Sequence, residues 1–94
     1  MMPIVFLIPG FLRQWTDAKS RVELQGQPAT VADALALLWE HHPGVRDRVM
    51  TEQGNVRPHV NVFVGPESIR FTGGLATPLQ GAREVSIVPA VSGG

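Results

Sequence analysis

The chain has 94 residues, enough for one domain with a single hydrophobic core but not for two. Its 44% apolar residues and 17% charged residues are typical of a globular protein, and eight basic residues balance eight acidic ones, so bulk charge predicts no binding to nucleic acid or to an anionic membrane. The chain contains no cysteine, which excludes disulfides, iron–sulfur clusters, thiolate metal sites and a cysteine nucleophile.

Two strands are predicted near the N-terminus. The run PIVFLI, residues 3–8, is apolar on both faces, as is typical of a strand inside a sheet. This run is too short to span a bilayer, and no basic region precedes it as in a signal peptide, so we expect a cytoplasmic protein. The run RVEL, residues 21–24, alternates polar and apolar side chains and predicts a half-buried strand that pairs back on the first.

One long helix follows these strands. Thr30 and Asp33 have the spacing of a capping box, and the sequence VADALALLWEHH predicts a helix over residues 31–42. Leu35 and Leu38 belong to its apolar stripe and are expected to pack on the sheet. The Pro-Gly pair that follows should end this helix, and VRDRVMTE could add one or two further turns.

The second half of the chain predicts three more strands. VNVFV, residues 60–64, alternates so that its three valines share one face and Phe63 lies on the other. SIRF, residues 68–71, predicts a short strand, and EVSIVP, residues 84–89, predicts the last one.

A single main helix can cover only one face of such a sheet. We therefore expect an α+β fold of the β-grasp, or ubiquitin-like, type, with a mixed four- to five-stranded sheet and the last strand in the middle beside the first. Residues 1–89 should form this domain. Phe63 then faces away from the helix, where a large apolar side chain is a candidate contact for a docking partner.

Residues 90–94, AVSGG, predict a flexible C-terminal tail without charge. Two terminal glycines arise by chance in roughly 0.5% of chains, so the pair Gly93-Gly94 favours a function. An extended five-residue tail reaches about 16–18 Å, which would place the last carboxylate well inside a partner's active site. Glycine is the residue that lets a backbone approach that closely.

Other kinds of site find little support in the sequence. His41 and His42 point about 100° apart on a helix and His59 lies in a loop, so no metal site is predicted. No serine occupies a nucleophile motif, and the glycine-rich loop TGGLATPLQG lacks the pattern of a phosphate-binding loop. We therefore do not expect an enzyme.

The stretches VNVFV, SIRFTGGLATPL and EVSIVPAVSGG resemble the MoaD/ThiS family of sulfur carrier proteins, and within it the CysO-type carriers of cysteine biosynthesis. The similarity covers nearly the whole chain and is strongest over residues 56–94. The resemblance implies a carrier that binds no cofactor itself. It implies that an E1-like enzyme adenylates the Gly94 carboxylate with ATP and magnesium, and that this carboxylate then becomes a thiocarboxylate at the end of a tail that includes Ser92 and Gly93.

A CysO-type carrier also implies two further partners. A PLP-dependent cysteine synthase would receive the sulfur, and a JAMM-type zinc peptidase would release the product. Three alternatives stay open at this point. The sulfur could serve molybdopterin, thiazole or another thio-metabolite, the chain could be a ubiquitin-like modifier of proteins, or it could be a non-covalent binding module with an idle tail.

Overall fold

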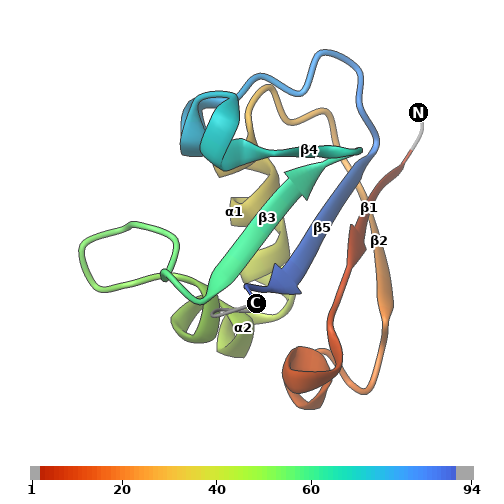
Figure 1. Cartoon of the computed structure of the whole chain (residues 1–94). Helices are drawn as coiled ribbons and strands as arrows, with labels where there is room; N and C mark the ends of the chain where they lie inside the picture. The colour runs from red at the N-terminus through yellow and green to blue at the C-terminus, as the bar shows by residue number, and fades with distance from the viewer. Residues whose placement is uncertain (1–2, 91–94) are drawn as a thin grey trace.

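The computed structural model describes residues 3–90, which contain one mixed five-stranded sheet (Figure 1). The strands are β1 (Pro3–Leu7), β2 (Arg21–Gln25), β3 (Val60–Val64), β4 (Glu67–Ser68) and β5 (Glu84–Pro89). Their order across the sheet is β2-β1-β5-β3-β4, with β1 and β5 parallel and the other neighbours antiparallel. The last strand therefore lies in the middle beside the first, and the predicted β-grasp fold is confirmed.

Both α-helices lie on the same side of this sheet (Figure 1). They are α1 (Val31–His41) and α2 (Pro43–Val49), and the short 3₁₀ helices are η1 (Gly10–Trp15), η2 (Ile69–Phe71) and η3 (Gly74–Ala76). The Thr30 hydroxyl accepts a hydrogen bond from the Asp33 backbone N–H at 3.2 Å, which confirms the predicted cap of α1. Pro43 ends α1 and also starts α2, because proline is well suited to the first turn of a helix.

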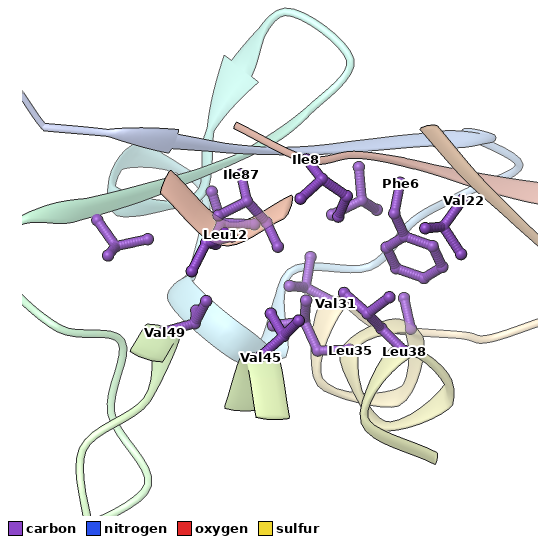
Figure 2. Close-up of a cluster of buried hydrophobic side chains, with 14 of the residues drawn as sticks. Phe6, Ile8, Leu12, Val22, Val31, Leu35, Leu38, Val45, Val49 and Ile87 are labelled. Atoms are coloured by element: carbon purple, nitrogen blue, oxygen red, sulfur yellow. The ribbon is translucent and has the colours of Figure 1, made fainter. Parts of the chain in front are cut away.

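The core fills the space between the sheet and these helices (Figure 2). Alternate residues of the strands, such as Phe6 and Ile87, meet Leu35 and Leu38 of α1 and Val45 of α2. Leu35 is 1% exposed and Leu38 is fully buried, so the predicted helix stripe is confirmed. The opposite face of the sheet carries the other half of each strand's side chains.

The predicted short strand over residues 68–71 is wrong beyond Ser68. Residues 69–71 instead form η2, where the Ser68 hydroxyl accepts a hydrogen bond from the Arg70 N–H at 3.3 Å. The Arg70 guanidinium also reaches back to donate to the backbone oxygens of Pro58 and Val60, at 2.9 and 3.2 Å. These contacts hold the chain in a turn, so Ile69 is buried whereas Phe71 is 88% exposed.

No helix within residues 3–90 has both the length and the apolar character needed to cross a bilayer. The predicted tail begins at residue 90, and most of it lies outside the described residues. The division into a domain of residues 1–89 and a tail of residues 90–94 thus stays a prediction.

Candidate functional site

The candidate site is the end of β5, from which the predicted tail leaves the domain. β5 is hydrogen-bonded to a neighbour on each side, and Pro89 pairs with Val60 of β3. The next backbone N–H, that of Ala90, donates to the His59 carbonyl oxygen at 2.8 Å. The sheet therefore fixes the chain in position up to residue 90.

The tail residues predicted to carry the function are Ser92, Gly93 and Gly94, and all three lie outside the described residues. Their roles stay predictions.

An apolar hollow of about 640 Å³ opens beside Ala90. Its walls are formed by Pro9, Gly10, Phe11, His59, Pro89 and Ala90. Phe11 comes from η1 and is 42% exposed, which is a large exposed fraction for a phenylalanine. The hollow thus brings together segments from both ends of the chain, and the sequence alone did not predict it.

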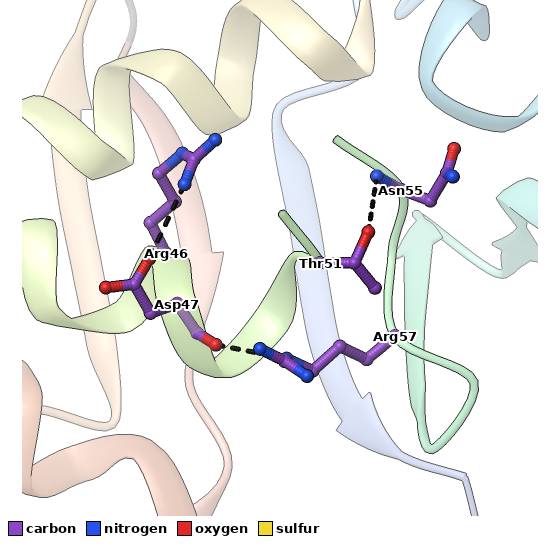
Figure 3. Close-up of polar contacts among 5 residues, drawn as sticks. All are labelled: Arg46, Asp47, Thr51, Asn55 and Arg57. Atoms are coloured by element: carbon purple, nitrogen blue, oxygen red, sulfur yellow. Dashed lines mark hydrogen bonds and ion pairs between the residues drawn. The ribbon is translucent and has the colours of Figure 1, made fainter. Parts of the chain in front are cut away.

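A smaller hollow of about 240 Å³ is lined by the charged residues Asp47, Arg48 and Arg57 together with His59. Figure 3 shows the contacts of Arg57 and Asp47. The Arg57 Nε donates a hydrogen bond to the Asp47 backbone oxygen at 3.0 Å, and the Asp47 carboxylate lies 3.5 Å from the Arg46 guanidinium. In the adjoining loop the Thr51 hydroxyl accepts from the Asn55 N–H at 3.2 Å, which fixes the turn that leads to Arg57 (Figure 3). The Arg48 guanidinium lies 4.4 Å from the centre of the Trp15 ring, within the range of a cation–π contact.

The sheet face that points away from the helices forms a second candidate surface. Phe63 pairs with Ser86, and Ser86 also pairs with Leu7, so these three side chains form one row across β3, β5 and β1. All three are partly exposed, whereas Val60 and Val62 of β3 are buried in the core. The predicted orientation of Phe63 is confirmed, and its role in docking stays a prediction.

Phe71 is a more exposed aromatic residue than Phe63, and sequence reasoning did not single it out. A strand over residues 68–71 would have placed it on the same face as Ile69. The glycine pair that follows at positions 73–74 is a turn signal that could have argued against a strand.

The histidines do not converge on one point. One ring nitrogen of His41 lies 3.1 Å from the Leu37 carbonyl oxygen, whereas His59 lines the two hollows beside Ala90. Within residues 3–90 no group of three or more His, Asp or Glu side chains is placed to bind a metal ion.

Comparison with known proteins identifies relatives of the whole chain. The profile of the ThiS family matches residues 6–94. The sulfur carrier protein CysO of Mycobacterium tuberculosis is 34% identical over 95 residues, covering 99% of this chain and 100% of that protein. The small archaeal modifier protein 3 of Haloferax volcanii is 39% identical over 66 residues, which cover 70% of this chain and 71% of the modifier.

A solved structure shares the fold. In the crystal structure of the Amycolatopsis orientalis BexX/CysO complex, one chain superposes with a TM-score of 0.83 and 31% identity, covering 97% of this chain and 99% of that one. That complex joins CysO to another protein, BexX.

Proposed function

The chain belongs to the ThiS family, and on that basis we propose that it carries sulfur as a thiocarboxylate at Gly94. The family match extends to residue 94, and the match to the mycobacterial sulfur carrier covers that protein completely. The observation that carries the proposal is the position of β5. This strand is held between β1 and β3, and its backbone hydrogen bonding continues to Ala90 at one end of the sheet.

The proposed chemistry has two steps, both performed by partner enzymes. An oxygen of the Gly94 carboxylate attacks the α-phosphorus of ATP, pyrophosphate leaves, and an acyl-adenylate forms. With sulfide as donor, the sulfur then attacks the acyl carbon and AMP leaves, so the terminal carboxylate has exchanged one oxygen for sulfur. With a persulfide as donor, the same attack gives an acyl disulfide, and a second thiol of the donor breaks its S–S bond, which releases the thiocarboxylate and leaves a disulfide on the donor. ATP and magnesium are substrate and cofactor of the E1-like partner. The chain itself acts as a protein substrate, and its dependence on ATP favours a cytoplasmic location.

The composition of the chain suits this role. Because no cysteine is present, sulfur acquired by the chain has no side-chain thiol to form a disulfide with. Gly93 would keep the tail slim beside the reacting carboxylate, since glycine allows the closest backbone approach.

For the destination of the sulfur we propose cysteine biosynthesis, supported by the full-length similarity to CysO. A PLP-dependent cysteine synthase would then accept the sulfur, and a JAMM-type zinc peptidase would release cysteine from the carrier. Incubation of the thiocarboxylate form with candidate synthases distinguishes this pathway from molybdopterin or thiazole synthesis. The synthase that consumes the sulfur identifies the pathway. Transfer of the sulfur returns the mass of the carrier to that of its carboxylate form, and attachment of cysteine increases that mass by one cysteine residue.

Conjugation to other proteins is a second candidate function, favoured by the similarity to the small archaeal modifier protein 3. In that case the activated Gly94 would form an amide bond with a lysine of a target protein. Blots of cell extract against the tagged chain would then show high-mass conjugates that disappear when Gly94 is deleted.

The direct test of the carrier function is the intact mass of the chain after incubation with ATP, magnesium, a sulfur donor and the E1-like enzyme of the same organism. We expect wild-type protein to gain sulfur, and we expect none in a variant lacking Gly94 or in one with an extra residue after it. Circular dichroism should show the same fold in all three. If the variant without Gly94 acquires sulfur at the wild-type rate, the carrier proposal is wrong and a non-covalent binding module becomes the better account.

A further inference from the structure

An apolar hollow and a charged hollow adjoin each other where the chain leaves β5. His59 lines both of them, and its carbonyl oxygen accepts the hydrogen bond from Ala90. One is the apolar hollow with Phe11, and the other is the charged hollow with Arg48 and Arg57. We call the four side chains of Phe11, Arg48, Arg57 and His59 the collar.

The charged half of the collar is basic. Arg48 and Arg57 line the charged hollow together with one carboxylate, that of Asp47, and the guanidinium of a third arginine, Arg46, lies 3.5 Å from that carboxylate. This carboxylate is already paired with Arg46, and the described residues show no ion pair for Arg48 or Arg57. Arg48 is exposed and Arg57 is half-buried, so both retain hydrogen-bonding capacity toward a partner.

The positions of both arginines are fixed before any partner binds. The Arg57 side chain is tied to the α2 backbone through the Asp47 carbonyl, and Arg48 is stacked on Trp15. Pre-positioned side chains lose less conformational entropy on binding, so they make effective contacts with an oppositely charged group. A basic surface of this kind is complementary to carboxylates of a partner.

The occupant of the collar follows from where the collar lies. A partner that draws the tail into its active site must also cover the surface from which the tail emerges, because an extended five-residue tail reaches only about 16–18 Å. The balanced net charge of the chain argues against nucleic acid or an anionic membrane, both of which are bound through a general excess of positive charge. The adenylating enzyme itself is the partner best matched to this surface.

We propose that the collar docks an acidic segment of the E1-like partner, with carboxylates placed against Arg48 and Arg57 and one apolar side chain seated beside Phe11. This inference rests on the proposed function and specifies how the partner recognises the domain before it acts on the tail. Contacts made away from the reacting carboxylate strengthen association and leave the chemical step unaltered.

The test compares the steady-state kinetics of sulfur loading at low and at high salt. We expect the double variant Arg48→Glu with Arg57→Glu to raise KM for the carrier about tenfold at low salt while kcat stays close to the wild-type value. The increase should shrink in high salt, because added ions screen exposed charges. Phe11→Ala should raise KM to a similar extent at both salt concentrations, since its contact is apolar.

Two controls separate charge from folding. The double variant Arg48→Lys with Arg57→Lys retains both positive charges and should keep KM near the wild-type value. If the role of the guanidinium groups were purely structural, this variant would raise KM as well. Arg21→Glu reverses one charge, half of the change in the double Glu variant, on the edge strand β2, two strands away from β5, and should leave KM unchanged. Thermal unfolding of each variant shows whether it is folded under the assay conditions.

The outcomes for the two proposals are distinct. If wild-type protein acquires sulfur and the folded Glu variant has the wild-type KM, the collar is not a docking surface and the carrier function stands. The docking inference is equally wrong if the Lys variant is as impaired as the Glu variant. If wild-type protein acquires no sulfur with the E1-like enzyme, the carrier function fails and the docking inference fails with it.

Discussion

At the residue scale, Gly44 shows how closely η1 and α2 are packed. A Cβ added at Gly44 would lie 2.5 Å from Cδ1 of Trp15 and 3.2 Å from its Cγ. These ring atoms cannot easily move away, because Trp15 packs on the core and carries Arg48 on its ring face. Position 44 therefore requires glycine because there is no space for a side chain.

We expect Gly44→Ala to reduce the free energy of unfolding by about 1–3 kcal/mol, the usual cost of overpacking. In an open helix the same change would stabilise by about 0.5–1 kcal/mol, so the sign of the effect reports the contact with Trp15. Gly10→Ala is the matched control, because a Cβ there meets no atom within 4 Å. Urea denaturation measures both variants, and a Gly44→Ala protein as stable as the Gly10→Ala protein would show that Trp15 can shift.

At the element scale, α1 is attached to the sheet by its buried leucines. Leu35→Ala should cost about 2–5 kcal/mol of stability, because it leaves a cavity between α1 and the strands. Leu37 on the same helix is only partly buried, so Leu37→Ala should cost clearly less. Denaturant unfolding of the two variants gives the comparison, and a loss below about 1 kcal/mol for Leu35→Ala would show that Leu35 is not part of the core.

The outer face of the sheet is the second element with a prediction. Phe63 lies between Ser86 and Ser68 in the cross-strand register, and within residues 3–90 both α-helices lie on the other side. We expect Phe63→Asp to preserve the fold, because the side chain is outside the core, and to slow adenylation by removing an apolar contact with the partner. Phe63→Leu keeps an apolar side chain and should retain most of the rate. Unchanged adenylation kinetics in folded Phe63→Asp protein would remove Phe63 from the docking surface.

At the scale of the whole molecule, the parts of the fold that depend on local pattern could be predicted. β5 begins and ends where the alternation of EVSIVP indicates, and α1 begins directly after the capping residue Thr30. The central position of β5 followed from the order of the elements and from the single face that one main helix can cover.

The features that depend on distant contacts could not be predicted in the same way. η2 forms because Arg70 reaches the backbone of Pro58 and Val60, which no pattern within SIRF reveals. The collar likewise joins η1, α2 and the residues before β3, which are far apart in the sequence. The role of Gly94 came from the resemblance to a family of carriers, and it lies in the part of the chain beyond the described residues.

The measurement that tests the central claim most directly is the location of the acquired sulfur. Replacing one oxygen by sulfur adds about 16 Da, the same nominal gain as oxidation of one methionine to its sulfoxide. Trypsin cleaves after Arg83, the last basic residue, and leaves a peptide of residues 84–94 that contains neither methionine nor tryptophan. Iodoacetamide applied before digestion has no cysteine to react with in this chain, so it should mark only the acquired sulfur.

The account predicts that the label lies in peptide 84–94 and that fragmentation assigns it to Gly94. A gain of mass confined to any other peptide, or an unlabelled peptide 84–94 in protein that has gained sulfur, would contradict it.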